Sequence, residues 1–494
     1  MKTDIPELNI KKYDIKKSLS NFISEDIAKR YEIAPLARKD NQLEIAMTPP
    51  FDLMVVDDIE KITGLQIKYY LASKEEIYTI NKEIYQNSGD SSLKLIEDLS
   101  ELETEAISEL NQDQYILPKS PIVKMANKIL EKAIKNKASD VHIEPQKDEV
   151  RVRFRIDGVL NSEMILPKYA QSALISRYKI MADLDITKRK LPQDGRINYR
   201  YNTQEIDMRI STIPVIYGEK LVIRILNKDK NLLNLTKLGF RISGLKKYIK
   251  LLSSSNGIIL VTGPTGSGKT TTLFSGLKYL NSPDLNIISV EDPIEYEIKG
   301  INQIQTAKET GFSYSQTLRS LLRQDPDIIM IGEIRDKETA QIAVRAALTG
   351  HLVLSTLHTN DAISSIIRLE NIGIPSYLVA ATLKGVIAQR LVRKLCRNCG
   401  TEEKKNYIKN RKNKKNYKSR GCEMCNNTGY KGRTGIYEIL EVNDDIRNLI
   451  LKKYTKDKIK NKALQIGMKS LEEDAKIKVK KGITTTKEVK RVIQ

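Results

Sequence analysis

The sequence predicts an α/β protein with several domains, and three observations indicate this. The chain has 494 residues, which suggests about three domains. From about residue 238 onward, apolar runs of strand length alternate with helix-like stretches, as expected for a buried and largely parallel sheet. A glycine-rich loop separates one of these apolar runs from the helix-like stretch that follows it.

The composition is that of an ordinary globular protein, with 40% hydrophobic and 29% charged residues. This composition excludes a collagen, a disordered chain and a multispanning membrane protein. The longest uncharged run, residues 251–268, contains serine, glycine and proline, so it does not predict a membrane span. The N-terminal residues Met1-Lys2-Thr3-Asp4 lack the apolar core of a signal peptide, and we therefore expect a cytoplasmic protein.

The N-terminal part of the chain predicts a small α/β module over residues 1–85. Residues 43–47 and 65–70 have strand patterns, and residues 57–62 and 75–85 have helix patterns. The following stretch, residues 86–117, is polar and acidic. We interpret it as a linker.

A second module is predicted over residues 118–235. Its first helix covers residues 123–136. Three strands follow that place arginines on one face, and they cover residues 150–156, 206–210 and 221–225. Arginines on such a face can simply be solvated. The alternative is that they point at an anion bound between modules.

A phosphate-binding loop is the strongest functional signal. The apolar run 257–262 is followed by the pattern G-x-x-x-x-G-K-T and then by a helix-like stretch. In this context the backbone N–H groups converge on phosphate oxygens, Lys269 reaches the β- and γ-phosphates, and Thr270 offers its hydroxyl to Mg²⁺. The alternative is a glycine-rich turn that binds no nucleotide. The predicted nucleotide-binding residues are Gly263, Pro264, Thr265, Gly266, Ser267, Gly268, Lys269, Thr270 and Thr271.

Two carboxylates and a histidine follow further predicted strands. Glu291 follows the run 287–290, and Glu333 follows the run 327–331 with Gly332 where a typical Walker B motif has aspartate. We expect Glu333 to polarise the attacking water and Glu291 to support Mg²⁺, although the two roles could exchange. His358 follows another strand and can read the γ-phosphate. The alternatives are a helix cap or surface charge for the carboxylates and a structural role for the histidine.

The four cysteines of the chain have the spacing C-x2-C-x22-C-x2-C, with Cys396 and Cys399 in the first pair and Cys422 and Cys425 in the second. Paired thiolates of this kind predict a tetrahedral structural Zn²⁺ site, the alternative being four free buried thiols. The segment 401–420 between the pairs holds nine basic and two acidic residues. It is either a solvated tip or a contact for an acidic partner or anionic lipid.

Together these motifs resemble the secretion ATPase superfamily, which contains the type II secretion and type IV pilus assembly ATPases. The resemblance covers the Walker A motif (263–270), an Asp box (291–296), an atypical Walker B motif (322–336) and a His box (349–360). Segments 138–145, 153–158 and 191–196 resemble the second N-terminal domain of the family. The resemblance implies a PAS-like α+β second domain, a RecA-like core (236–390), a tetracysteine zinc element (391–430) and a C-terminal helical domain (431–494).

The resemblance also implies a hexameric ring at the inner membrane, with ATP bound between the second domain and the core. Arginines would then close on the phosphates, each with a bidentate guanidinium. The candidates are Arg155, Arg196 and Arg209 from the second domain, and Arg319 and Arg323 from the core.

The same resemblance indicates the partners. The N-terminal module would dock a cytoplasmic part of an inner-membrane partner, and the ring would act on a membrane platform protein. Some relatives bind cyclic di-GMP through Arg-Leu-Gly motifs. Because no such motif lies upstream of Ile23, we expect no cyclic di-GMP binding.

The leading hypothesis is an ATP-driven motor for type IV pilus assembly, with type II secretion as the close alternative. A nucleic-acid translocase is the alternative of another class, and a scaffold that does not hydrolyse ATP is a third. The formal net charge is +21, and most of the excess lies in segments 401–420 and 452–491, after the ATPase motifs. This distribution favours an acidic partner or an anionic membrane surface, and we expect no nucleic acid.

Overall fold

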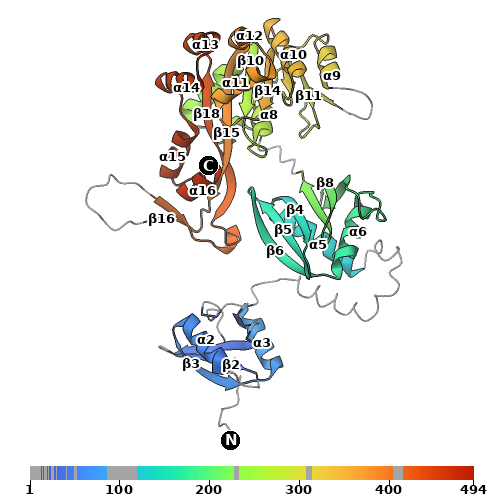
Figure 1. The fold of residues 1–494 in the computed structure, drawn as a ribbon, viewed down its shortest axis with the longest axis vertical. Helices are drawn as coiled ribbons and strands as arrows, with labels where there is room; N and C mark the ends of the chain where they lie inside the picture. The colour runs from blue at the N-terminus through green and yellow to red at the C-terminus, as the bar shows by residue number, and fades with distance from the viewer. Residues whose placement is uncertain are drawn as a thin grey trace, which may run out of the picture. The chain divides into compact units, whose positions relative to one another are not determined.

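The computed structural model describes residues 31–39, 42–48, 53–85, 120–226, 233–306, 314–403 and 416–493, together with a few positions between 13 and 28 (Figure 1). The chain forms two compact units, residues 1–128 and 129–494, which are described separately below. The predicted linker 86–117 lies outside the described residues.

The N-terminal unit contains a three-stranded sheet of order β1-β2-β3. Strand β2 pairs antiparallel with β1 and parallel with β3. Its buried core includes Leu43, Ile45, Ile59 and Ile80. The mixed pairing and the helices match the predicted small α/β module. The elements are β1 (Ile33–Lys39), β2 (Gln42–Met47), α2 (Leu53–Thr63), β3 (Gln66–Leu71) and α3 (Lys74–Tyr85).

The second unit begins with a six-stranded antiparallel sheet of order β6-β5-β4-β9-β8-β7. Alternate side chains of its strands, such as Val141, Ile143, Val152 and Phe154, are buried. The residues between them are polar or charged, such as His142 and Arg153, so one face forms a core and the other is polar. The elements are α5 (Pro121–Lys135), β4 (Ala138–Pro145), β5 (Glu149–Ile156), β6 (Val159–Pro167), α6 (Ala170–Met181), β7 (Gln193–Tyr201), β8 (Gln204–Val215) and β9 (Gly218–Ile225).

The predicted RecA-like core is built on a seven-stranded sheet of order β12-β11-β13-β14-β10-β15-β18. The first six strands are parallel, and β18 pairs antiparallel with β15. All six residues of β10 are buried, as expected for a strand in the middle of a parallel sheet. The strands are β10 (Gly257–Thr262), β11 (Ile287–Glu291), β12 (Asn302–Gln305), β13 (Ile328–Ile331), β14 (Leu352–Leu357), β15 (Leu383–Leu395) and β18 (Tyr430–Glu441).

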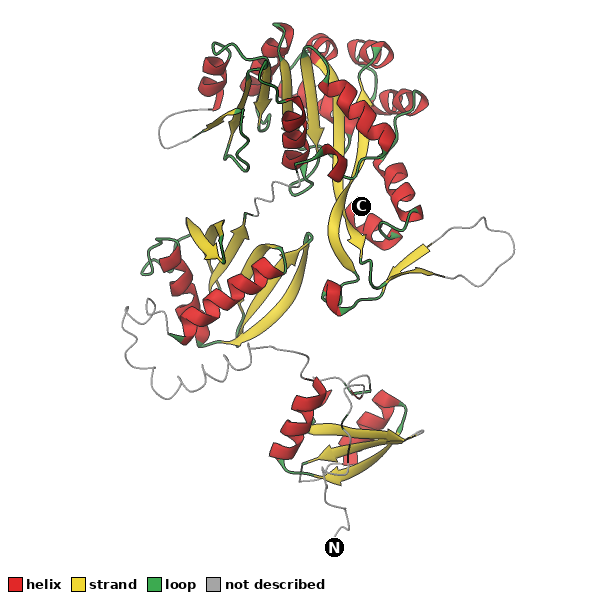
Figure 2. Ribbon diagram, turned by 180° about the vertical axis from the view of Figure 1, so that it is seen from behind, coloured by secondary structure: helices red, strands yellow, loops and turns green. Residues whose placement is uncertain are grey.

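Helices cover both faces of this sheet (Figure 2). Ile258 and Leu260 of β10 belong to one apolar cluster, and Ile259 and Val261 belong to another, because successive strand residues point to opposite faces. The helices of the core are α7 (Ile242–Leu252), α8 (Lys269–Leu280), α9 (Tyr314–Leu321), α10 (Lys337–Leu348), α11 (Ala362–Ile372) and α12 (Ser376–Thr382).

Four helices follow β18 and add to the first of these clusters: α13 (Asp444–Leu451), α14 (Lys456–Gln465), α15 (Leu471–Lys480) and α16 (Thr486–Ile493). Asp474 anchors α15 on β18, because its carboxylate accepts the N–H of Tyr437 (3.0 Å) and pairs with Arg241 (2.6 Å) and Lys478 (3.2 Å). Strand β15 runs past residue 390, and β18 lies almost wholly in the segment predicted as helical. The core sheet therefore extends further along the chain than the predicted boundary.

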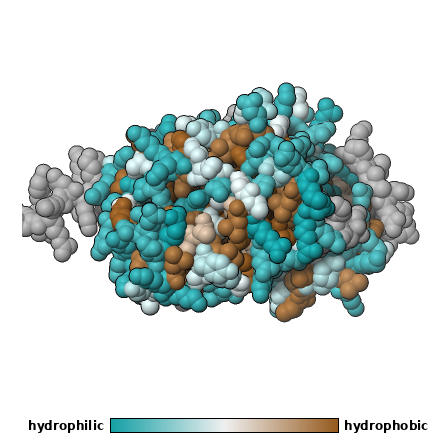
Figure 3. Space-filling model, turned by 90° about the horizontal axis from the view of Figure 1, so that it is seen from above, coloured by the Kyte–Doolittle hydropathy of each residue, from teal (hydrophilic) through white to brown (hydrophobic). Residues whose placement is uncertain are grey.

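Among the described residues, no helix is both long enough and apolar enough to cross a membrane. On the face shown in Figure 3, apolar side chains form small patches separated by hydrophilic ones.

Candidate active site and cysteine cluster

A cavity of about 760 Å³ lies at the carboxyl ends of β10, β11, β13 and β14. The structure brings most of the predicted site residues together around it. Gly263 and Pro264 are not among the residues that line the cavity, although they begin the same loop. The predicted residues that line it are Thr265, Gly266, Ser267, Gly268, Lys269, Thr270, Thr271, Glu291, Glu333 and His358.

The phosphate-binding loop has a backbone that only glycine adopts readily. Gly266 and Gly268 have φ of 75° and 85°, in the left-handed region, and Gly268 is the N-cap of α8. The Lys269 ammonium donates to the carbonyl oxygens of Gly263 (2.9 Å) and Pro264 (3.2 Å), and burial lowers its pKa. The loop therefore surrounds a cation next to a helix N-terminus, which is an arrangement that binds phosphate.

Ser267 gives a second indication of a ligand. Its residue is 4% exposed, it lines the cavity, and its Oγ has no hydrogen-bond partner among the described residues. A buried hydroxyl without a partner costs free energy unless a ligand or water satisfies it. Lys269, the Thr270 hydroxyl and the carboxylates of Glu291 and Glu333 are the groups that a nucleotide triphosphate with Mg²⁺ requires.

Glu291 ends β11 and is 3% exposed. Its Oε1 accepts hydrogen bonds from Ser289 Oγ (2.7 Å) and Gln303 Nε2 (3.0 Å). Burial raises the pKa of this carboxyl, although both hydrogen bonds favour its charged form. Glu291 is thus a fixed and desolvated carboxylate, a good position for a group that supports a cation.

Glu333 follows β13 and is more accessible than Glu291. His358 Nε2 lies 3.4 Å from its Oε2, and Arg335 pairs with its Oε1. The Thr356 hydroxyl donates to the carbonyl oxygen of Gly332 (2.8 Å), which ties the ends of β13 and β14 together. Glu333 and His358 therefore form a polar pair at the edge of the cavity.

Tyr314 explains why glycine occupies position 332. A Cβ at this position would lie 3.2 Å from the Tyr314 hydroxyl and 3.3 Å from the Val290 carbonyl oxygen. The hydroxyl donates to that carbonyl oxygen (2.9 Å). A side chain at position 332 would therefore be crowded by these two groups, and Glu333 is the carboxylate that this strand presents to the cavity.

The five predicted arginines do not line the cavity. Arg155 Nε lies 3.4 Å from Asp140 Oδ2, and Arg319 pairs with Glu338 on α10. Arg323 donates to the carbonyl oxygen of Arg319 (3.1 Å) and to Ser320 Oγ (3.2 Å).

Arg196 and Arg209 belong to a row of charges across the second-domain sheet. Directly paired positions on neighbouring strands are, in order, Arg196, Arg209, Arg224, Asp140 and Arg155. Such pairs share one face, and like charges opposite each other destabilise a sheet unless an anion binds. Arg224, which pairs with Asp140 (3.1 Å), was not among the predicted residues. The sequence predicted a strand with an arginine on one face at residues 221–225, but only the strand register places Arg224 beside Arg209.

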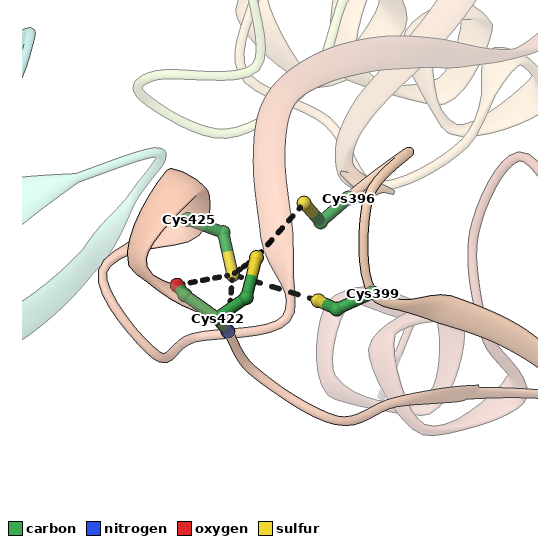
Figure 4. Close-up of side chains that lie close together, drawn as sticks. All are labelled: Cys396, Cys399, Cys422 and Cys425. Carbon is green, nitrogen blue, oxygen red and sulfur yellow. Dashed lines mark hydrogen bonds between the residues drawn. The ribbon is translucent and has the colours of Figure 1, made fainter.

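The four cysteines come together in the structure (Figure 4). The sulfur–sulfur distances are 3.8 Å for Cys396–Cys422 and 3.7 Å for both Cys399–Cys425 and Cys422–Cys425. A tetrahedron with Zn–S bonds of about 2.3 Å has edges of about 3.8 Å, so the cluster fits zinc. Backbone N–H groups of Cys422 and Gly429 also donate to Cys425 Sγ (both 3.2 Å), and such hydrogen bonds stabilise a thiolate that binds a metal.

Short elements lie next to the cysteine pairs: β16 (Gly400–Glu403) follows Cys399, β17 (Asn416–Ser419) precedes Cys422, and the 3₁₀ helix η8 (Glu423–Cys425) contains Cys425. Residues 404–415, which include most of the predicted basic loop, lie outside the described part of the chain.

Comparison with known proteins gives the same picture. Residues 117–491 match the family described as type II/IV secretion system protein, and residues 3–91 match the MshEN domain. The type IV pilus assembly ATPase PilB of Myxococcus xanthus is 41% identical, over 98% of this chain and 88% of its own. The type II secretion system ATPase E of Vibrio cholerae is 40% identical, over 92% of each chain.

Solved structures share the fold. The pilus retraction motor PilT with bound ADP is 28% identical, with a TM-score of 0.50 over 74% of this chain and 95% of its own. The ATPase DotB of Legionella pneumophila, at 22% identity, has a TM-score of 0.58 over the same shares.

Proposed function

This chain belongs to the family of type II/IV secretion system proteins and is an ATPase, and we propose that it hydrolyses ATP to assemble pilin subunits into a type IV pilus. The observation that carries the proposal is the convergence of Lys269, Glu291, Glu333 and His358 on one cavity. The proposal for pilus assembly draws on the similarity to pilus assembly ATPases over nearly the whole chain.

ATP would bind with its phosphates in the loop that precedes α8. Lys269 would exchange the carbonyl oxygens of Gly263 and Pro264 for the β- and γ-phosphates. Thr270 and Glu291 would hold Mg²⁺, which neutralises charge on the phosphates. Glu333 would orient the attacking water, and His358 would hold that carboxylate and sense the γ-phosphate.

The arginines would complete the site after the second domain closes on the core. The row that contains Arg196, Arg209 and Arg224 has an excess of positive charge that an anion would relieve. Arg155 at its end is held by Asp140 and would be released toward the phosphates. Arg319 and Arg323 of the α9 region would supply charge from the core.

The zinc element would be structural. Four thiolates at tetrahedral distances leave no open position on the metal, and a closed site supports folding rather than chemistry. Cys396, Cys399, Cys422 and Cys425 would hold one Zn²⁺.

The assembly would be a homo-hexamer in the cytoplasm, peripheral to the inner membrane. Its N-terminal module, residues 1–85, would dock a cytoplasmic part of the machine, and the ring would act on a membrane platform protein. The basic C-terminal part could then face an anionic membrane surface. That this module binds no cyclic di-GMP stays a prediction, which calorimetric titration tests.

Type II secretion is the second candidate, favoured by the similarity to the secretion ATPase of V. cholerae over 92% of this chain. Deletion of the gene in its source organism separates the two. Loss of surface filaments with normal protein export supports pilus assembly, and loss of export with intact filaments supports secretion. Wild-type protein should restore the phenotype and Lys269→Ala should not.

The nucleic-acid alternative has a simple test. ATP turnover of the purified protein should not change when DNA or RNA is added at low salt. Stimulation that falls steeply with salt would instead indicate a translocase.

A further inference from the structure

Two neighbouring polar residues of β15, Gln389 and Arg390, lie where the phosphate-binding loop leaves β10. The last residue of β10, Thr262, pairs with Ala388, so the two residues occupy the next positions along β15. Gln389 is 2% exposed and Arg390 is 9% exposed. Because successive side chains of a strand point to opposite faces, these two reach opposite sides of the core sheet.

Gln389 braces the phosphate-binding loop. Its Oε1 accepts a hydrogen bond from Thr272 Oγ1 (2.7 Å), in the first turn of α8. A Cβ at Gly268 would lie 2.9 Å from Gln389 Nε2, and a Cβ at Gly263 would lie 2.5 Å from its carbonyl oxygen. Gln389 therefore touches the first glycine, the last glycine and the helix that follows, which together fix the shape of the loop.

Arg390 braces the loop that carries His358. Its Nη2 donates to the carbonyl oxygen and to Oδ1 of Asn360, both at 3.1 Å, and its Nη1 donates to the carbonyl oxygen of Gln389 (3.1 Å). Between His358 and Asn360, the N–H of Thr359 donates to Thr262 Oγ1 (2.9 Å). The loop is thus held on two sides, by β15 and by β10.

The electrostatics agree with this geometry. Burial lowers the pKa of Arg390, while Asp361 and Glu438 favour its charged form. The positive charge of Arg390 in turn acts to lower the pKa of Lys269, and Glu333 acts to raise it. Arg390 is therefore electrostatically coupled to the residues that would contact the phosphates.

We propose that Gln389 and Arg390 are positioning residues with separate tasks in ATP hydrolysis. Gln389 holds the phosphate-binding loop in the shape that binds ATP, and Arg390 holds the His358 loop in the shape that serves Glu333. This inference rests on the proposed roles of Lys269, Glu333 and His358. Gln389 lines the cavity and Arg390 does not. We assign neither of them a contact with the reacting atoms, so their effects should separate into binding and turnover.

The test compares kinetic constants with affinity for a non-hydrolysable ATP analogue, using the full chain. Gln389→Met, which keeps the side-chain volume, should raise KM and the analogue Kd about tenfold and leave kcat within about twofold. Arg390→Ala should lower kcat about tenfold and leave the Kd within about threefold. Arg390→Lys should recover part of kcat, because an ammonium can still donate to Asn360.

A matched control separates positioning from folding. Arg393 lies on the same strand and pairs with Glu488 at 2.8 Å. Arg393→Ala should lower the melting temperature without changing kcat or KM. The double variant Gln389→Met with Thr272→Val removes both partners of the Thr272–Gln389 hydrogen bond, so it should regain part of the melting temperature lost in Gln389→Met but not the ATP affinity.

Several outcomes would overturn the inference. It fails if Arg390→Ala changes the Kd as much as kcat, if Arg393→Ala lowers kcat equally, or if the double variant regains full affinity. Glu333→Gln, measured in parallel, distinguishes this failure from failure of the proposed function. If Glu333→Gln hydrolyses ATP at the normal rate, the proposed active site itself is wrong.

Discussion

His358 Nε2 lies 3.4 Å from Glu333 Oε2, so the imidazole that follows β14 contacts the carboxylate that follows β13. The two strands are parallel neighbours, and parallel strands bring their carboxyl ends to one edge of a sheet. Two residues 25 positions apart in the sequence therefore form one polar pair beside the phosphate-binding loop.

Removing the charge of Glu333 should stop hydrolysis without stopping ATP binding. We expect Glu333→Gln to lower kcat at least about 100-fold, because the amide cannot accept a proton from water, with ATP affinity within about threefold. His358→Ala should lower kcat about tenfold. Steady-state turnover and analogue titration measure both effects. His351, whose Nδ1 contacts the Ala346 carbonyl oxygen (2.9 Å) at the other end of β14, provides the control, and His351→Ala should retain full turnover. Equal losses in the two histidine variants would contradict a role for His358.

Glu291→Gln should make the protein more stable at neutral pH while lowering its turnover. Burial raises the pKa of Glu291 in the folded protein, so folding opposes its ionisation. Stability is therefore lost as the pH rises from the ordinary glutamate pKa through the raised one. The neutral variant avoids this loss. Thermal unfolding at pH 7.5 should show a rise of about 1–3 °C.

The rise should shrink as the pH falls through the raised pKa of the folded state, and it should vanish below the ordinary glutamate pKa, where Glu291 is protonated in both states. The control is Glu472→Gln on α15, since Glu472 pairs with Lys476 at the surface and its pKa is lowered. This variant should show no stabilisation at neutral pH. A gain for Glu291→Gln that persists at low pH would mean that packing, and not charge, is the cause.

Placing aspartate at position 332, where a typical Walker B motif has it, should lower the rate of ATP hydrolysis. A Cβ at Gly332 would crowd the Tyr314 hydroxyl (3.2 Å) and the Val290 carbonyl oxygen (3.3 Å). We expect Gly332→Asp to lower kcat at least about tenfold, because overpacking displaces Glu333. Gly332→Ala should have a smaller effect, and adding Tyr314→Phe should relieve part of it. The idea is wrong if Gly332→Asp turns over ATP as fast as the wild type.

The cysteine cluster should contain about one Zn²⁺ per chain. Cys396→Ser should lower the bound zinc below about half an ion per chain and lower the melting temperature, because metal binding and folding are coupled. Elemental analysis of the purified protein measures the metal. Arg397→Ala changes the residue next to Cys396 without removing a ligand, and it should keep the full zinc content. If the wild-type protein is purified without zinc and removal of metal leaves its melting temperature unchanged, the four cysteines are free buried thiols and the zinc site is wrong.

The sequence predicts the core of this fold well where one strand is fully buried. Strand β10 covers Gly257–Thr262, the same residues that the apolar run before the glycine loop predicts. The reason is local: a continuous apolar run next to a phosphate-binding loop has few other structures available. The cavity residues of the loop were predictable for the same reason.

Strand β18 could not be predicted from the sequence. It contains Gly432 and Gly435, and glycine weakens a strand signal. Only its ladder with β15 reveals that it belongs to the core sheet. The register that places Arg224 beside Arg209 and the packing of Gln389 on Gly268 are likewise properties of the folded chain. Neither relationship can be predicted from a local sequence pattern, because each joins residues that are far apart in the sequence.

Strand β15 connects the phosphate-binding loop to the cysteine cluster. Gln389 touches the phosphate-binding loop, and Cys396 follows the end of the strand, after Leu395. Gln389 and Leu395 are six positions apart in extended chain, a span of about 20 Å. Hydrogen bonds to β18 stiffen this span into a ribbon. A tilt of about 5° at the end next to the phosphate-binding loop would move the cysteine end by about 2 Å, as a lever arm does.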